Sequence, residues 1–132
     1  MPSPSGKIWV LMVDDNAEHV ELCKESLPGD EFEVDTAPTG TDAMRMLGIN
    51  FYDIVVIDYT LPDFSGLELL KRIKAKGFNV PAVFVSASDD ADLSVKALKA
   101  GACDYIVKTF RYYANLRGRL LENIEACSSK GR

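Results

Sequence analysis

Short apolar runs recur at regular intervals along the chain, and segments with helical spacing of apolar residues lie between them. This alternation is typical of βαβ units, which build a parallel sheet covered by helices on both faces. We therefore predict an α/β domain made of five βα units. The predicted strands are Ile8–Val13, Phe32–Ala37, Ile54–Ile57, Ala82–Val85 and Tyr105–Val107.

The intervening segments carry apolar side chains three or four positions apart, as amphipathic helices do. The first predicted helix has Val20, Cys23 and Leu27 on one face, and the second starts near Thr39. The third runs from about Ser65 to Lys76 and has a capping-box pattern at its start. The fourth ends at Gly101, and the fifth covers about Tyr112–Cys127.

Polar side chains follow four of the five predicted strands, at the point where each strand ends. The first strand ends at Asp14 and Asp15, the third at Asp58, the fourth at Ser86 and the fifth at Lys108. In an open parallel sheet the carboxyl ends of the strands share one crevice, where ligands bind. We expect these distant residues to meet at a single site.

The three carboxylates of this predicted site indicate a divalent cation, because close negative charges repel unless a cation neutralises them. An oxygen-only ligand set suits Mg²⁺ or Mn²⁺ rather than zinc. Asp58 is the candidate nucleophile, since a carboxylate can form an aspartyl phosphate. Lys108 and Ser86 would hold phosphoryl oxygens, while Asp15 would be the more direct metal ligand and Asp14 would act through the metal shell.

Each of these residues also has an ordinary structural interpretation when it is taken alone. Asp15 could cap the first helix, Asp58 could be a strand-end acid, Ser86 could cap a helix, and Lys108 could be a solvated lysine. The coincidence of all of them at strand ends favours the single site.

Composition narrows the class of protein further. The chain has 132 residues, of which 47% are hydrophobic, and a formal net charge of -5. These values fit one packed domain and argue against nonspecific nucleic-acid binding. The last 25 residues, from 108 onward, are basic while the rest is acidic, which predicts either a solvated helix face or a docking surface for an acidic partner. The first apolar run is too short to be a signal peptide or a membrane span, so a cytoplasmic location is expected.

The cysteines and the single histidine carry no recognisable motif. Cys23, Cys103 and Cys127 lack CxxC or ligand-like spacing, so we predict small core residues in a reducing compartment. His19 falls outside the apolar stripe of the first helix and is predicted to be a surface residue, with a docking contact as the alternative.

Four segments together resemble the receiver domain of two-component response regulators: Val13–Asn16, Ile57–Gly66, Val85–Ala87 and Ala100–Lys108. The resemblance covers about residues 7–128, with 1–6 expected to be a disordered N-terminus and 129–132 a tail or the start of a linker. It implies a flavodoxin-like (βα)5 fold with strand order 2-1-3-4-5. It also implies a signalling domain, not an enzyme beyond its own phosphorylation and dephosphorylation, in which Asp58 accepts a phosphoryl group from a phosphohistidine on a sensor kinase or phosphotransfer protein.

The resemblance also assigns roles by position. It implies metal ligands at Asp14, Asp15, Asp58 and the backbone carbonyl of Thr60; phosphoryl contacts at Ser86, the Ala87 backbone and Lys108; switch residues at Ser86 and Tyr105; and tuning of hydrolysis by Thr60 and Ser88. The expected output is a shift of the face made by the fourth helix, the fifth strand and the fifth helix toward a downstream effector. Homodimerisation through that face is compatible with the sequence but not demanded by it.

One departure from the family pattern is Thr109, where proline usually follows the lysine with a cis peptide. A cis bond before a non-proline residue costs about 3 kcal/mol. The loop is therefore either trans and reshaped or cis and strained, and we expect the trans form. Three other interpretations of the chain compete with an active receiver. The first is a haloacid-dehalogenase-type phosphatase, which needs a second aspartate two residues after the nucleophile, where this chain has Thr60. The second is a carrier of flavin mononucleotide, whose phosphate Asp14 and Asp15 would repel. A degenerate receiver that binds partners without phosphorylation remains as the alternative.

Overall fold

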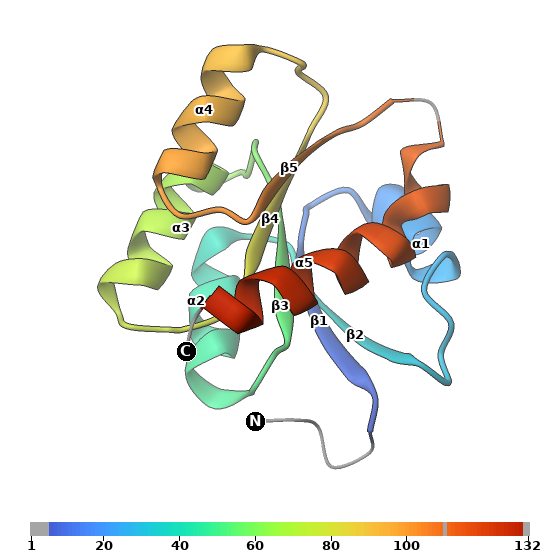
Figure 1. Cartoon of the computed structure of the whole chain (residues 1–132). Coiled ribbons are helices and arrows are strands. Elements are labelled where there is room, and N and C mark those ends of the chain that lie inside the picture. The colour runs from blue at the N-terminus through green and yellow to red at the C-terminus, as the bar shows by residue number, and fades with distance from the viewer. Residues whose placement is uncertain (1–5, 110, 131–132) are drawn as a thin grey trace.

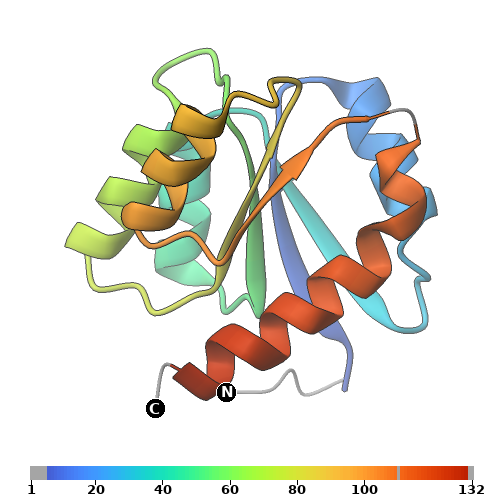
Figure 2. The same ribbon diagram turned by 45° about the horizontal axis from the view of Figure 1, so that its top comes forward.

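The structure is a computed structural model that describes residues 6–109 and 111–130. A five-stranded parallel sheet with the order β2-β1-β3-β4-β5 forms its middle layer. Helices α1 and α5 cover one face of the sheet, and α2, α3 and α4 cover the other (Figures 1 and 2). The predicted flavodoxin-like fold and strand order are confirmed.

Each strand begins and ends within a residue or so of its prediction. The strands are β1 (Ile8–Val13), β2 (Phe32–Ala37), β3 (Ile54–Asp58), β4 (Ala82–Ser86) and β5 (Asp104–Val107). The central strand β3 is fully buried up to Asp58, as expected of a parallel strand covered on both faces. In register, Asp58 lies beside Val85 of β4, and Ser86 lies beside Val107 of β5.

The helices follow the predicted pattern with small changes at their ends. They are α1 (Ala17–Glu25), α2 (Gly40–Ile49), α3 (Gly66–Ala75), α4 (Ala91–Lys99) and α5 (Leu116–Lys130). Ser65 caps α3 by accepting from the Glu68 N–H, as its sequence pattern indicated. The fifth helix differs, because Tyr112 and Tyr113 lie in a separate 3-10 turn, η1 (Tyr112–Asn115), before α5 begins.

The sheet separates two apolar cores, because alternate strand residues point to opposite faces. Leu11 and Phe84 belong to the core under α2, α3 and α4. Met12 and Val83 belong to the core under α1 and α5, together with Cys23, which is buried as predicted. The expected N-terminal segment 1–6 lies outside the described residues except for Gly6, and residues 131–132 of the expected tail also lie outside them.

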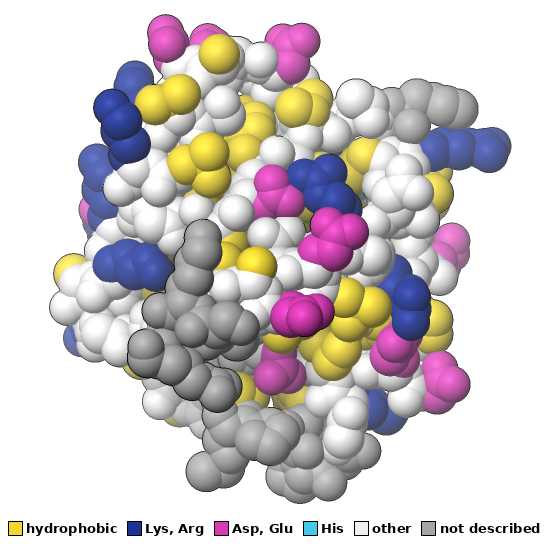
Figure 3. All heavy atoms as spheres, in the orientation of Figure 1, with side chains coloured by type: hydrophobic (Ala, Val, Ile, Leu, Met, Phe, Trp, Pro, Cys, Tyr) yellow, Lys and Arg dark blue, Asp and Glu magenta, His cyan; other side chains and the backbone are white. Residues whose placement is uncertain are grey.

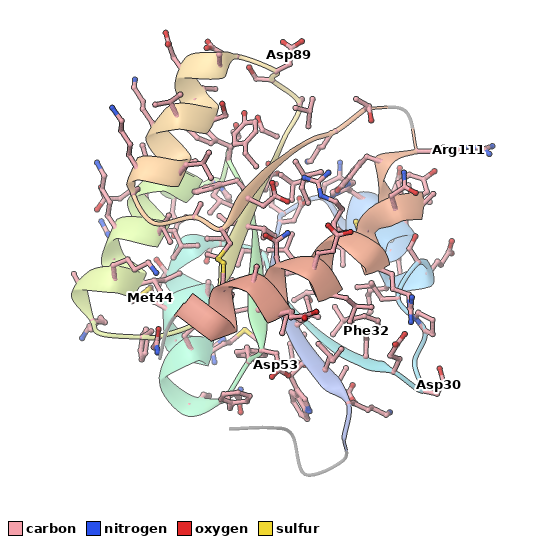
Figure 4. The ribbon with its side chains drawn as sticks, viewed as in Figure 1. Asp30, Phe32, Met44, Asp53, Asp89 and Arg111 are labelled. Carbon is pink, nitrogen blue, oxygen red and sulfur yellow. A yellow bond between two sulfur atoms is a disulfide. The ribbon has the colours of Figure 1, made fainter. Side chains whose placement is uncertain are left out.

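The prediction that Cys103 and Cys127 are unpaired core residues is wrong. Their sulfurs are bonded at 2.04 Å, and the two positions have a sequence separation of 24 (Figure 4). The physical reason is topological. Helix α5 runs back along the sheet after β5, so its end returns to the start of β5, where Cys103 precedes Asp104. Sequence spacing alone does not show this approach.

Surface charge is unevenly distributed (Figure 3). Acidic side chains gather around the start of α4, where Asp89 projects from the loop after β4 (Figures 3 and 4). Two arginines of the basic C-terminal region make ion pairs within the domain: Arg117 Nε lies 2.6 Å from Glu31, and Arg119 lies 2.7 Å from Asp104. Part of that basic charge therefore stabilises the packing of α5.

Candidate functional site

The carboxyl ends of the strands bring the predicted polar residues together. Asp14 follows β1, Asp58 ends β3, Ser86 ends β4 and Lys108 follows β5. The chain leaves each of these strands at the same edge of the parallel sheet, which is where ligands bind in folds of this kind. The structure therefore places in one site the residues that the strand-end pattern selected.

Asp14, Asp15 and Asp58 form a compact acidic cluster. Each offers a carboxylate oxygen, and the three oxygens lie within 4.8 Å of one another. Asp14 is buried, Asp58 is half-buried and Asp15 is exposed. Closely spaced carboxylate oxygens open to solvent on one side suit Mg²⁺, which takes one or two carboxylates and keeps several waters. The donor set present therefore fits this cation.

Lys108 faces the cluster from the end of β5. Its Nζ lies 3.5 Å from Asp58 Oδ2 and 3.8 Å from Asp14 Oδ2. No peptide bond in residues 6–109 and 111–130 is cis, so the expected trans bond at Thr109 is confirmed. The Lys108 N–H donates to the Ser86 carbonyl at 2.7 Å, which holds the lysine backbone against β4. The departure at Thr109 thus leaves the reach of Lys108 intact.

The pKa values of the two inner carboxylates shift in opposite directions. Burial raises the pKa of Asp58, and the nearby Asp14 charge adds to this rise, while Lys108 offsets part of it. Burial also opposes the ionisation of Asp14, but hydrogen bonds from His19 and from the Asn16 N–H outweigh it and lower the pKa of Asp14. Asp14 is therefore the more firmly anionic of the two.

The loop after β4 is folded around hydroxyl contacts. Ser86 is buried, and its Oγ accepts from the Ser88 N–H at 3.1 Å. The Tyr105 hydroxyl donates to the Ser88 carbonyl at 2.9 Å, so the two predicted switch residues contact the same loop residue. Ala87, between Ser86 and Ser88, is exposed. In the loop after β3, the Thr60 N–H approaches Asp58 Oδ1 at 3.4 Å.

Gly66 allows the first turn of α3 to approach the backbone of the acceptor strand. A Cβ at this position would lie 2.5 Å from the carbonyl oxygen of Asp58 and 2.8 Å from Ile57 Cγ2. The Gly66 N–H donates to the Tyr59 carbonyl at 2.8 Å. The absence of a side chain is therefore needed to keep α3 packed behind Asp58.

Asp63 ties the loop after β3 to the start of α2. Its carboxylate accepts from the Gly40 N–H at 3.0 Å, from the Thr41 N–H at 2.9 Å and from the Thr41 hydroxyl at 2.8 Å. Although desolvation opposes ionisation, these bonds, and one from the Phe64 N–H, lower the pKa of Asp63. The carboxylate acts as an N-terminal cap supplied by a distant loop.

His19 is not the surface residue that the helical stripe predicted. Its side chain is only 14% exposed, and Nδ1 lies 2.5 Å from Asp14 Oδ2. The hydrogen bond with Asp14 is the main reason that the pKa of His19 rises to about 9. Nε2 is hydrogen-bonded to the Tyr112 hydroxyl. The apolar-stripe criterion missed His19 because it sorts positions by hydrophobicity, whereas this side chain faces a carboxylate.

Comparison with known proteins identifies the family of this chain. Residues 10–120 match the family model for the response regulator receiver domain. The chain is 33% identical over 120 residues to the transcriptional regulatory protein ZraR of Salmonella typhimurium, covering 91% of this chain and 26% of ZraR. It is 35% identical over 116 residues to TrcR of Mycobacterium tuberculosis, covering 86% of this chain and 45% of that regulator. The chain thus spans less than half the length of these relatives.

Solved structures show the same fold. A CheY-like receiver domain protein from Methanospirillum hungatei has a TM-score of 0.83 and 25% identity, covering 94% of this chain and 98% of that one. A response regulator from Thermotoga maritima has a TM-score of 0.80 and 31% identity, covering 90% and 98% of the two chains.

The chain belongs to the response regulator receiver domain family, whose general function is phosphorylation on an aspartate in two-component signalling. The family consists of signalling domains rather than classical enzymes. Its members generally bind Mg²⁺ through acidic residues and interact with histidine kinases and downstream effectors. In the part of the chain that the structure describes, no helix is long and apolar enough to span a membrane.

Proposed function

We propose that Asp58 is the phosphoacceptor of this receiver domain and takes its phosphoryl group from a phosphohistidine on a sensor kinase or a phosphotransfer protein. One observation carries the proposal. The half-buried Asp58 carboxylate ends the central strand between an ammonium at 3.5 Å and two further carboxylates. In the step, an Asp58 oxygen forms a bond to phosphorus while the phosphorus–nitrogen bond breaks and the imidazole leaves.

Asp14, Asp15, Asp58 and the backbone carbonyl of Thr60 would hold Mg²⁺, or Mn²⁺ in its place. The cation supplies neutralisation of phosphoryl charge, which is the main requirement of phosphoryl transfer besides positioning. Asp14 is fixed by the Asn16 N–H, which donates to Oδ1 at 2.9 Å. The donor chemistry of the cluster supports this assignment.

Lys108, Ser86 and the Ala87 N–H would hold the phosphoryl oxygens. Lys108 is a compact cation close to Asp58, and Ser86 is the hydroxyl at the end of the next strand. Thr60 and Ser88 would flank the approach of water and so would influence the lifetime of the phosphate.

The switch would run through Ser86 and Tyr105. Both contact Ser88, so a movement of the Ser86 hydroxyl toward a phosphoryl group would disturb the partner of Tyr105. The face formed by α4, β5 and α5 would then shift toward a downstream effector, and homodimerisation through this face fits the same change. We further propose that residues 7–128 form the receiver unit and that the protein is cytoplasmic, where the Cys103–Cys127 pair would be kept mainly in its reduced form.

Intact mass after incubation with acetyl phosphate tests the acceptor, with and without Mg²⁺. We expect one added phosphoryl group on the native chain, none without Mg²⁺ and none on Asp58→Asn. Asp53→Asn is the matched control, because Asp53 lies at the opposite end of β3 and accepts from the Trp9 N–H. No addition to the native chain under any condition would overturn the assignment and favour a phosphorylation-independent binding module.

A further inference from the structure

His19 and Tyr112 form a polar link between the acidic cluster and the turn that follows Lys108. His19 lies on α1, and Tyr112 is the first residue of η1. Their rings stack with centroids 5.4 Å apart and planes 25° apart. The Tyr112 hydroxyl contacts His19 Nε2 and lies 3.5 Å from Cys23 Sγ. Two residues 93 positions apart thus share one contact beside the site.

Both oxygens of the Asp14 carboxylate are engaged before any ligand arrives. Oδ1 accepts from the Asn16 N–H at 2.9 Å, and Oδ2 contacts His19 Nδ1 at 2.5 Å. Each carboxylate oxygen has a second lone pair for a further ligand. Groups that bond to a metal ligand from outside orient it, and their loss typically weakens metal binding. His19 is such a group, because it contacts the Asp14 carboxylate and is not itself in the acidic cluster.

The contacts are satisfied whether or not the imidazole is charged. A neutral ring donates from Nδ1–H to Asp14 and accepts at Nε2 from the Tyr112 hydroxyl. A charged ring donates from both nitrogens, and the Tyr112 hydroxyl can then donate to the Cys23 sulfur. The orientation of His19 therefore follows from the fold rather than from its titration.

We propose that His19 is a positioning residue for the cation site, and that Tyr112 orients it from the opposite nitrogen. This role rests on the proposed cation site at Asp14. It connects Asp14 to Tyr112, in addition to the contact with the Lys108 ammonium, which faces the same carboxylate oxygen at 3.8 Å. The Tyr112 hydroxyl would thus influence cation binding without touching the cation.

Titration calorimetry with Mg²⁺ alone tests the role, using substitutions that remove one contact at a time. His19→Gln removes the donor at the Nδ1 position, and we expect about a tenfold weaker Mg²⁺ affinity. His19→Asn places an amide nitrogen at the Nδ1 position, so we expect its affinity to stay close to native. Tyr112→Phe keeps the stacked ring and removes only the hydroxyl, and we expect a smaller loss of affinity than for His19→Gln, because Tyr112 acts through His19.

Two comparisons separate positioning from a general loss of structure. Tyr113→Phe removes the hydroxyl of the neighbouring tyrosine, which meets Tyr112 edge to face, and should leave the Mg²⁺ affinity unchanged. The double variant His19→Gln, Tyr112→Phe should bind no more weakly than His19→Gln alone, because both changes break one link. Thermal melts in metal-free buffer establish that each variant is folded.

The role is overturned if His19→Gln binds Mg²⁺ as tightly as the native chain or more tightly, or if the two substitutions add. Failure of the proposed cation site looks different, because the native chain itself would then show no binding. In that case the ¹⁵N-detected imidazole signals of the metal-free protein still report the contact. They should shift in Tyr112→Phe and not in Tyr113→Phe, and equal spectra would contradict the link.

Discussion

Lys108 Nζ lies 3.5 Å from Asp58 Oδ2, at the point where β5 ends beside the carboxyl end of the sheet. The ammonium lowers the pKa of Asp58, against the larger rise caused by burial. Lys108→Met keeps the length of the side chain and removes the charge. We expect the pKa of Asp58 to rise further in metal-free buffer, and phosphorylation by acetyl phosphate to slow by at least about tenfold.

Side-chain ¹³C NMR titration measures the carboxyl pKa, and intact mass measured over time gives the rate. Lys99→Met on α4 is the control, because this lysine lies in the last turn of a helix on the outer side of the molecule. Equal rates for Lys108→Met and the native chain would show that the ammonium has no part in phosphoryl transfer.

Gly66→Ala should disturb the acceptor strand from behind. The new Cβ would lie 2.5 Å from the Asp58 carbonyl oxygen, so either α3 or the end of β3 must move. Overpacking of this kind costs about 1–3 kcal/mol of unfolding free energy. Urea denaturation measures the loss, and Gly48→Ala, where a Cβ meets nothing within 4 Å, is the matched control in a helix. A loss no greater than that of the control would contradict the close-approach role.

Sequence reasoning succeeded where topology alone determines position. Strand-end residues such as Asp58 and Lys108 lie at the same edge once the sheet is parallel. That inference needed the period of the apolar runs and the polar residue at the end of each run. The trans peptide before Thr109 was also predictable, because a cis bond before a non-proline residue is costly in free energy.

The residues that sequence reasoning missed are those whose partners depend on how layers pack. His19 meets Tyr112 only because η1 packs against α1, and no spacing along the chain encodes a contact between residues 93 positions apart. The prediction that Cys103 and Cys127 are unpaired was wrong for a related reason. Their pairing depends on the length and angle of α5, which return its end to the start of β5.

Asp63→Asn should destabilise the domain in a pH-dependent manner. The carboxylate accepts bonds from the start of α2 on both oxygens, and an amide offers only one acceptor oxygen. Because folding lowers the pKa of Asp63, its contribution is fully present above the unfolded pKa of about 3.9 and is lost as pH falls through the folded value. We expect a loss of about 1 kcal/mol at pH 7.

Denaturation of both proteins at a series of pH values checks this dependence. The difference between native and variant should be constant near neutral pH and shrink in the acid range. Asp30→Asn, at an exposed position in the turn before β2, supplies the control. A difference that stays the same down to acid pH would show that the charge of Asp63 does not support the cap.

The Cys103–Cys127 disulfide should stabilise the domain when it is formed. It closes a loop with a sequence separation of 24, and a crosslink of that length is worth about 3 kcal/mol in the chain-entropy description. Urea denaturation with and without dithiothreitol measures the difference.

Cys103→Ser and Cys127→Ser should match each other and the reduced native chain, because each loses the same bond. The double variant should lose nothing more. Cys23→Ala should keep its response to the reductant, since the Cys23 thiol is buried and free. Three titratable thiols in the unreduced, unfolded native chain, with a denaturation midpoint unchanged by the reductant, would contradict the disulfide.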